Sequence, residues 1–323
     1  MTKTIIRRLL IMIPQLIVIS LFIFFLAENM PGDALTGLIS PDIHPSEIEA
    51  MREALGFNRP WPERYLEWIF GVLQGDFGWS FQHVQPVINI VGERLANTVW
   101  LGIVALFFQY SIAIPLGVLA GKNLGKPIDR IIVVYSFLSL AMPTILMGII
   151  MLFWLSPVGW GWFPLGGSVN AIVLSSGDPV AIFFNRLHHL ILPALSIALA
   201  STAGIIFYLR SNIVERRNSD YVTLARSKGV PERVIFGKHI FRNSLIPIAS
   251  DIGIAIVGVL TGSILIERIF NFPGIGQLFL TSITQRDFAV ANFLIMFLSM
   301  LSVIGVLISD IVLTLVDPRI RIK

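Results

Sequence analysis

Long apolar runs alternate with shorter polar intervals along the chain, and the apolar runs predict its organisation. A helix needs roughly 20 apolar residues to cross the hydrocarbon core of a bilayer. Six runs come close to that length, which predicts an all-α membrane protein with six transmembrane helices and both termini on the same side. The runs are residues 9–27, 99–121, 131 to about 155, 190–209, 245–266 and 288–309.

The first run follows Lys3, Arg7 and Arg8, an arrangement shared by cleaved signal peptides and retained first helices. The apolar part of a signal peptide is usually about 7–15 residues long and is followed by a small-residue cleavage site. The segment LAENMPGD offers no such site. We therefore expect a retained membrane helix, in which Pro14 is tolerated.

The polar interval after the first run has turns at MPGD (30–33) and GDFG (75–78) and two helical patterns between them. Ser46 and Glu49 match a capping box and Gly56 supplies a stop, which predicts a helix over residues 47–55. Residues 62–73 predict a second helix. Its Tyr65, Trp68 and Ile69 are expected to pack against other helices rather than to lie at the membrane interface.

A second interval, residues 154–187, is rich in aromatic residues that suit a membrane interface, such as Trp160 and Trp162. Its apolar pieces at 171–174 and 180–184 are too short to span a bilayer. We expect an external loop with short interfacial pieces.

Positive charge assigns the two sides of the membrane, because cytoplasmic loops carry an excess of Lys and Arg. Most of the 24 Lys and Arg residues lie in one set of segments, and we expect that set, with both termini, to face the cytoplasm. The segments are residues 1–8, 122–130, 210–242 and 317–323.

Composition agrees with a polytopic membrane protein, since 55% of the residues are hydrophobic and only 14% are charged. The net charge of +4 does not indicate a nucleic-acid partner, because the basic residues lie in short loops beside apolar runs. The chain has no cysteine, which excludes disulfides, thiolate metal sites and cysteine nucleophiles.

Two aspartates fall in the predicted spans, Asp251 in the fifth and Asp310 at the cytoplasmic end of the sixth. Such residues can mark an intramembrane aspartyl protease or a proton-coupled transporter. Both lie within a turn or two of the cytoplasmic ends, where water or loop cations can reach them. This position favours structural pairing or anchoring.

Metal and nucleotide sites are not indicated. The five histidines show no metal-ligand spacing with acidic partners. The string GVLAGK (117–122) superficially matches a phosphate-binding loop, but it is one residue short, Asn123 replaces the Ser or Thr, and it ends a membrane helix. Energy for any transport must therefore come from another subunit or from a gradient.

The basic interval 210–247 has local structure of its own. Ser219 or Asp220 can cap a helix, Gly229 supplies a left-handed stop, and Pro231 suits the first position of a second helix that runs to about residue 241. Two interpretations stay open: a helix that binds anionic lipid at the interface, or a docking element for a cytosolic partner. The residues assigned to one helical face are Tyr221, Leu224, Ala225 and Lys228.

These residues resemble a known family, the integral-membrane subunits of type I ABC importers and specifically the oligopeptide, dipeptide and nickel permease group. The segment DYVTLARSKGVPERVIFGKHIFRNSLIPI resembles that group's EAA coupling motif, with Ala225 and Gly229 at the second alanine and the glycine. Thr223 and Leu224 replace the general family's glutamate and first alanine, and the downstream I-x-L-P element is absent at its usual spacing. The peptide group commonly departs in this way.

The resemblance extends along nearly the whole chain and is closest to the first of the two permease subunits of such systems. The matching strings, in order, are RRLLIMIPQL, MPGDAL, GDFGWSF, RLANTVWLG, AMPTILMGI, HHLILPALSIAL and IERIFNFPGIGQLFLTSITQRDF. Their order and spacing carry the resemblance.

The resemblance implies a non-catalytic, multi-pass subunit of a prokaryotic cell-membrane importer for oligopeptides or dipeptides. It implies a second homologous permease, two cytosolic ABC ATPases that bind ATP and Mg²⁺, and an extracytoplasmic solute-binding protein, with membrane lipid around the spans. This chain itself would bind no cofactor or metal. The coupling-helix residues implied are Asp220, Tyr221, Leu224, Ala225, Lys228, Gly229 and Pro231.

The same comparison divides the chain into four parts. Residues 1–28 would hold a cytoplasmic segment and the first helix, and 29–94 an extracytoplasmic region with short helices. Residues 95–316 would form the ABC type-1 transmembrane domain, with its coupling loop at about 210–244, and 317–323 a cytoplasmic tail. Segments 28–98 and 267–287 would meet the binding protein.

Three alternatives remain open from the sequence. One is import of nickel or another small solute by the same kind of system. A gradient-driven secondary transporter would work alone and depend on Asp251 or Asp310. An intramembrane protease would need both aspartates.

Overall fold

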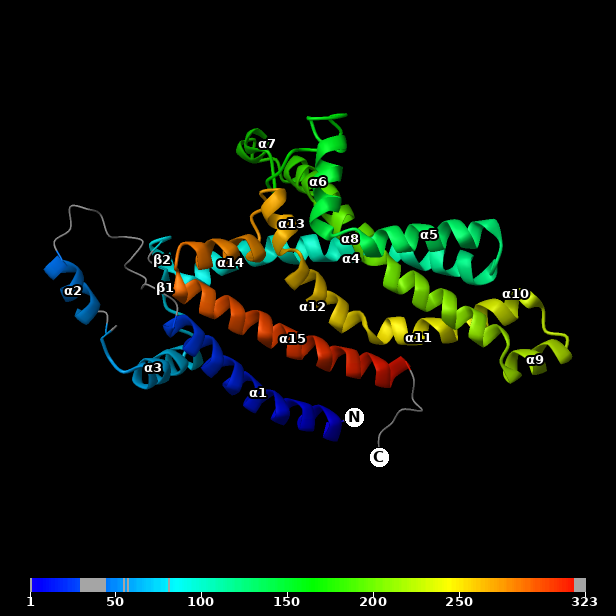
Figure 1. Ribbon diagram of the computed structural model, residues 1–323, viewed down its shortest axis with the longest axis horizontal. Coiled ribbons are helices and arrows are strands. Elements are labelled where there is room, and N and C mark those ends of the chain that lie inside the picture. The colour runs from blue at the N-terminus through cyan, green and yellow to red at the C-terminus, as the bar shows by residue number, and fades with distance from the viewer. Residues whose placement is uncertain (1, 30–44, 55, 57, 81, 317–323) are drawn as a thin grey trace. The chain divides into compact units, whose positions relative to one another are not determined.

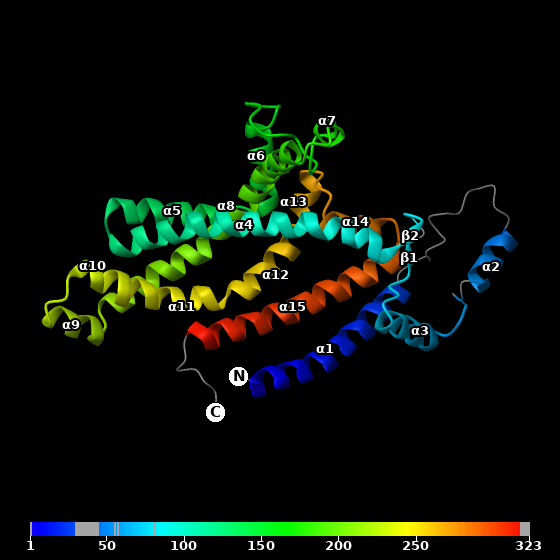
Figure 2. The same cartoon turned by 180° about the vertical axis from the view of Figure 1, so that it is seen from behind.

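The computed structural model describes residues 2–29, 45–54, 56, 58–80 and 82–316. The predicted MPGD turn at 30–33 and the predicted tail at 317–323 lie outside the described residues. Figures 1 and 2 show a helical protein with one small hairpin. Its elements are α1 (Thr2–Glu28), α2 (Pro45–Ala54), α3 (Trp61–Leu73), β1 (Trp79–Ser80), β2 (Gln85–Pro86), α4 (Val87–Lys122), α5 (Pro127–Ala141), α6 (Thr144–Leu155), α7 (Ala171–Ser175), α8 (Pro179–Arg217), α9 (Asp220–Ser227), α10 (Glu232–Val234), the π-helix η1 (Ile235–Phe241), α11 (Arg242–Ser250), α12 (Ile252–Gly262), α13 (Ile264–Ile269), α14 (Ile275–Thr284) and α15 (Phe288–Val316).

The predicted all-α class is confirmed. Within the described ranges, five helical segments are long and apolar enough to cross a membrane, and a bent pair of helices makes up to six. The five are Leu10–Glu28, Val87–Lys122, Pro179–Arg217, Ile252–Ile269 and Phe288–Leu315, and the bent pair is α5 with α6.

The third predicted span, residues 131–155, is not one straight helix. The axes of α5 and α6 differ by 104°, and Figure 1 shows α6 at a steep angle to α5. Met142 and Pro143 between them have extended backbone angles, with ψ of 113° and 138°. Proline disfavours helical angles in the residue before it, so the helix ends there. The apolar composition of residues 131–155 does not reveal this break.

The fourth span is longer than the sequence predicts. Asp178 caps α8 by accepting a hydrogen bond from the Val180 amide at 2.9 Å, and Pro179 follows it at a favoured first helical position. The piece at 180–184 is thus the start of α8, so its prediction as a separate interfacial piece is wrong. The piece at 171–174 lies in α7, which Asn170 caps in the same way.

The fifth predicted span, residues 245–266, is divided among α11, α12 and α13. Asp251 lies between α11 and α12, and Ser263 lies between α12 and α13. The segment with the length and hydropathy of a span is Ile252–Ile269. The observed span therefore begins and ends later in the sequence than the predicted one.

The described residues divide into two units. Unit 1 comprises Val99–Phe272 and the residues from Ile304 onward, and unit 2 comprises Thr2–Thr98 and Pro273–Val303. The division falls inside α4 and α15.

In unit 2, the helices predicted at 47–55 and 62–73 are present as α2 and α3, and Gly56 follows α2 with a left-handed φ of 72°. Tyr65 on α3 is buried, its hydroxyl lies 2.9 Å from the Ser20 hydroxyl of α1, and its ring meets that of Phe24 edge to face. Trp68 also contacts Phe24. This aromatic face packs against α1, as predicted.

Side chains also join distant parts of unit 2. The buried Asp287 precedes α15 and accepts a hydrogen bond from Ser80 of the hairpin. Thr98 accepts a 2.8 Å bond from the Ile275 amide at the start of α14, and Asn97 donates to the Pro273 carbonyl. The strings GDFGWSF and QRDF, and likewise RLANT and FPGIG, are thus in contact.

In unit 1, α4, α5 and α8 lie side by side (Figures 1 and 2). A Cβ on Gly121 would lie 2.8 Å from the Ile213 Cβ, and one on Gly117 would lie 3.0 Å from the Leu209 Cβ. The two glycines have the GxxxG spacing that lets membrane helices approach closely. The GVLAGK string is a helix-crossing surface, which explains its resemblance to a glycine-rich loop.

Candidate functional site

The candidate site is the polar segment between α8 and α11, whose first element is α9. Val222 and Ala225 of α9 are buried, with 0% and 9% of their surfaces exposed. They pack into an apolar core with Leu209 and Ile213 of α8. The rest of that core is Ile235, Ile240 and Ile248, flanked by Tyr110, Ile114, Val118, Ile205, Val230, Phe236 and Leu245.

The structure separates the residues that the sequence assigned to one face of α9. Ala225 points into the core, whereas Tyr221, Leu224 and Lys228 are exposed, with 37% of Tyr221 and 56% of Leu224 accessible. Val222 is the inward partner that sequence reasoning missed. Its spacing of three residues from Ala225 places both on one face, and this pattern was available in the sequence.

At the start of α9, Ser219 and Asp220 are present as predicted, but neither side chain caps the helix. Ser219 occupies the N-cap position, but its hydroxyl donates to the Arg216 carbonyl at 2.6 Å instead of capping α9. Asp220 is the exposed first residue of the helix, where a negative charge interacts favourably with the helix dipole.

Tyr221 links three elements although part of it is exposed. Burial alone would raise the pKa of its phenol, but hydrogen bonds with Ser219, Arg216 and Asn243, and the charge of Arg216, lower the pKa overall. Arg216 belongs to α8 and Asn243 to α11. The ring of Tyr221 therefore lies where α8, α9 and α11 meet.

Gly229 ends α9 with a φ of 73°, the left-handed conformation that the sequence predicts. The Gly229 amide donates to the Arg226 carbonyl at 2.9 Å, and the Val230 amide donates to the Ala225 carbonyl at 3.2 Å. This pair of bonds is a Schellman motif, and its usual apolar contact is present because Val230 and Ala225 share one core. We call residues 228–231 the glycine elbow.

An ion pair spans the glycine elbow. Arg226 Nε lies 2.5 Å from Glu232 Oε1, and the hydrogen bond with Arg226 lowers the pKa of the Glu232 carboxyl. Both side chains are exposed, at 39% and 67%, so the pair contributes little stability. Pro231 is the N-cap of α10 and not its first helical residue, so the helix begins one residue later than predicted.

The second predicted helix does not end near residue 241. It continues from α10 through the π-helix η1 into α11, which ends at Ser250. A π-helix is rare and often lies at a functional position. The Lys122 ammonium at the end of α4 lies 3.9 Å above the ring of Phe236 in η1, which ties α4 to this segment.

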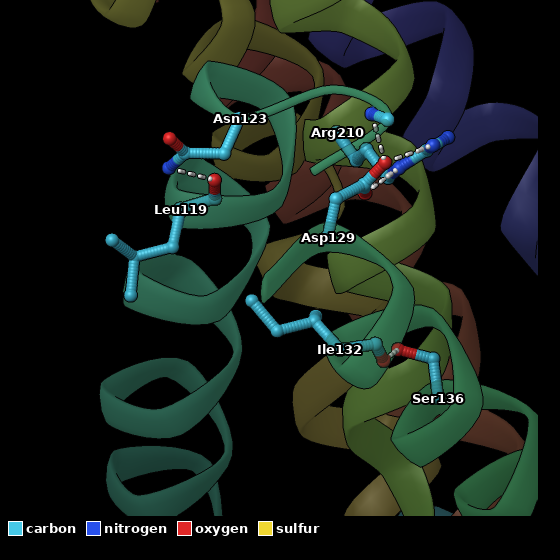
Figure 3. A network of polar contacts seen from close by, with 7 residues as sticks. Leu119, Asn123, Asp129, Ile132, Ser136 and Arg210 are labelled. Carbon is cyan, nitrogen blue, oxygen red and sulfur yellow. Dashed lines mark hydrogen bonds and ion pairs between the residues drawn. The ribbon is translucent and has the colours of Figure 1, made fainter. Parts of the chain in front are cut away.

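Sequence reasoning missed an ion pair between α5 and α8, in which the carboxylate is buried and the Arg210 side chain is 27% exposed (Figure 3). Arg210 of α8 binds Asp129 of α5 through two bonds, Nε to Oδ1 at 2.6 Å and Nη2 to Oδ2 at 2.9 Å. The Gly125 amide donates to Asp129 Oδ2 at 2.8 Å. Asp129 is only 2% exposed.

The two membrane aspartates lie beside a close helix crossing. A Cβ on Gly253 would lie 2.2 Å from the Gly305 carbonyl oxygen, and the Ile254 amide donates to the Ser309 hydroxyl at 3.2 Å. Asp251 precedes this crossing at the N-cap of α12, and Asp310 follows it on α15. This position fits an anchoring role at the crossing.

The histidines of α8 are engaged with backbone carbonyls. His188 Nε2 lies 2.8 Å from the Trp162 oxygen, and His189 Nδ1 lies 2.8 Å from the Asn185 oxygen. Within the part of the chain that the structure describes, no three His, Cys, Asp or Glu side chains are grouped as metal ligands would be.

Two family models match the chain. The model described as binding-protein-dependent transport system inner membrane component matches residues 113–322, and the model of the N-terminal part of such membrane components matches residues 1–102.

Curated relatives match over the full length. The oligopeptide transport system permease protein AppB of Bacillus subtilis is 39% identical, covering 99% of this chain and 100% of the relative. The dipeptide transport system permease protein DppB of Lactococcus lactis is 31% identical, with 100% of both chains covered. The glutathione transport system permease protein GsiC of Escherichia coli is 29% identical, again with 100% of both covered.

A solved structure shares the fold. An inward-facing structure of the MetNI methionine ABC transporter gives a TM-score of 0.55 at 16% identity, over 71% of this chain and 96% of that chain. At this identity the likeness concerns the fold alone, which is that of a type I importer permease.

Proposed function

Because the chain belongs to the family of inner membrane components of binding-protein-dependent transport systems, we propose that it is the permease subunit of a bacterial ATP-driven peptide importer. The observation that carries the proposal is the identity, over essentially the whole chain, with permeases named for oligopeptide, dipeptide and glutathione transport. The imported substrate is accordingly a short peptide.

The exposed face of α9 is the docking surface for a cytosolic ATPase. Tyr221, Leu224 and Lys228 project from a helix that Val222 and Ala225 fix to the apolar core shared with α8 and α11. The Schellman motif at Gly229 ends this helix at a defined angle. A rigid, partly apolar projection of this kind transmits displacement in both directions.

The partners follow from this role. A second, homologous permease completes the translocation pathway, two ABC ATPases bind the two coupling loops (residues 210–244 here), and an extracytoplasmic solute-binding protein delivers the peptide. ATP and Mg²⁺ are bound by the ATPases, and this chain contributes no catalytic group and no cofactor site of its own.

Transport is an alternation between inward-open and outward-open states. Closure of the ATPases on ATP moves α9 through the contacts of Tyr221 and Leu224. The apolar core under α9 joins this movement to α8 and α11, and the spans move as rigid bodies. ATP binding is thereby converted into a change of access for the peptide.

Purification from native membranes, followed by reconstitution, tests the proposal. We expect two ATPase subunits and a second permease to co-purify with this chain. The complete complex, but not this chain alone, should drive ATP-dependent uptake of labelled alanine peptides of two to five residues. Transport by the chain alone that requires Asp251 or Asp310 would instead establish secondary transport, and uptake of ⁶³Ni²⁺ without peptide uptake would establish nickel import.

A further inference from the structure

Building on the proposed function, we propose that Asp129 and Arg210 are positioning residues for ATP coupling. Their ion pair fixes the loop between α4 and α5 to α8, so that a displacement of α9 moves the cytoplasmic ends of α4, α5 and α8 as one body.

The geometry of the pair favours this role over a contribution to stability. Arg210 presents two parallel donors to both carboxylate oxygens, an arrangement that fixes orientation as well as distance. The Asp129 side chain is 3% exposed and the Arg210 side chain 27% exposed. Desolvation of the carboxylate offsets part of the attraction, and partial solvation of the guanidinium weakens it further. An ion pair at this site is therefore expected to specify geometry more than to stabilise the fold.

The third partner of the carboxylate extends this constraint to the loop. The Gly125 amide donates to Asp129 Oδ2, and Gly125 has a left-handed φ of 78°. The side chain of Asp129 thus holds the turn that ends α4 and begins α5. Arg210 joins that turn to α8, as Figure 3 shows.

The connection from Arg210 to α9 is short and rigid. Arg210 and Ile213 belong to the same helix, which ends at Arg217, and only Asn218 and Ser219 separate it from α9. Ile213 packs in the core under Val222 and also lies against Gly121 of α4. On the other side of the glycine elbow, Lys122 lies over Phe236 of η1. The coupling loop is therefore tethered to the α4–α5 turn on both sides.

The same turn contains a matched control. Asn123 donates to the Leu119 carbonyl at 2.9 Å, one turn back in its own helix, and this is the only bond that Figure 3 draws for it. Replacement of Asn123 changes the turn's composition without removing a link between helices.

The test uses the complete transporter in proteoliposomes and compares ATP hydrolysis with and without its solute-binding protein. The main variant is the double replacement Asp129→Asn with Arg210→Met, which removes both charges together and keeps an acceptor for the Gly125 amide. A second variant, Arg210→Lys, keeps the positive charge but cannot form the bidentate hydrogen bonds with Asp129. Asn123→Ala is the control.

We expect both variants to assemble and to unfold at nearly the wild-type temperature, while stimulation of ATP hydrolysis by the binding protein falls at least about fivefold, the lower end of usual coupling between sites. Asn123→Ala should keep wild-type stimulation. A purely structural pair would change thermal stability and stimulation together, so loss of stimulation at unchanged stability identifies the positioning role.

Wild-type stimulation in a stable double variant would overturn the inference. If the double variant fails to assemble, Arg210→Lys alone tests the inference. Wild-type stimulation of ATP hydrolysis in Arg210→Lys would then overturn it. If the wild-type complex shows no stimulation at all, the proposed function fails and the inference fails with it.

Discussion

Two glycines, one in the glycine elbow and one at the end of α4, are constrained for two different physical reasons. Gly229 has a φ of 73°, yet a Cβ there would meet no atom within 4 Å. Gly121 has ordinary helical angles, but its Cβ would lie 2.8 Å from that of Ile213. The first position is limited by backbone conformation and the second by space, so they should respond to different substitutions.

Gly229→Asp should leave membrane insertion intact and abolish ATP-driven uptake, because it places a negative charge in the docking surface. The matched control is Gly229→Asn, because Asn and Asp have the same shape and both tolerate left-handed angles. We expect the Asn variant to retain most uptake at equal expression. Normal uptake by the Asp variant would contradict the assignment of α9 to ATPase docking.

Gly121→Val should destabilise the protein by about 1–3 kcal/mol, because overpacking forces α4 and α8 apart. The control is Gly204→Ala in α8, an exposed position where a Cβ meets nothing within 4 Å. That replacement should be neutral or stabilising, by up to about 1 kcal/mol. Thermal unfolding in detergent measures both. Equal unfolding temperatures for the two variants would show that the crossing tolerates a larger residue.

The structural role of a single residue can be predicted from the sequence when neighbouring residues determine it. Gly229 follows an amphipathic helix and precedes a proline, so its left-handed conformation is predictable from neighbours. The Asp129–Arg210 pair joins residues separated by 81 positions. Without the fold, Asp129 is one acid in a helix's first turn and Arg210 one more base near a membrane boundary.

At the scale of elements, the glycine elbow combines a backbone motif with the exposed Arg226–Glu232 pair. The pKa of the Glu232 carboxyl is lower in the folded protein than its ordinary value of 4.5, through its bond with Arg226. The pair's contribution is therefore complete above about pH 4.5, and it is lost as the pH falls through the lower folded value.

We accordingly expect ATPase binding to be insensitive to this pair between pH 5.5 and 8. Glu232→Gln should bind the ATPase subunits nearly as well as wild type, because exposed pairs contribute little and the backbone motif remains. Binding measured at several pH values in detergent checks this. A pH dependence in this range that disappears in Glu232→Gln would show that the pair, rather than the Schellman motif, sets the angle.

Apolar runs predict where helices lie but not where they bend. The run 131–155 is continuous in hydropathy, yet Met142 and Pro143 turn its axis by 104°. The run 245–266 is interrupted at Asp251 and Ser263, and the helix before it contains a π-helical segment. Hydropathy averages over a window, whereas a bend depends on the backbone angles of one or two residues.

At the scale of the whole chain, the class and family were predictable because their evidence is spread over many residues. Hydropathy predicts the spans, and the ordered strings predict the family that the comparisons show. The contacts between those strings were not predictable in the same way. Ser80 and Asp287 lie 207 positions apart, and only the fold brings the hairpin to the start of α15.

The bent pair α5–α6 decides the topology, since five spans or six follow from whether it crosses the membrane. Because the chain has no cysteine, labelling of a single introduced cysteine shows directly on which side of the membrane that residue lies. We expect Ser176→Cys, after α7, to react with a membrane-impermeant maleimide on intact spheroplasts. Leu124→Cys, in the turn before α5, should react only after permeabilisation. The basic residues around Leu124 predict a cytoplasmic position for that turn. Labelling of both cysteines from the cytoplasmic side alone would therefore mean that the pair re-enters and that five spans place the termini on opposite sides.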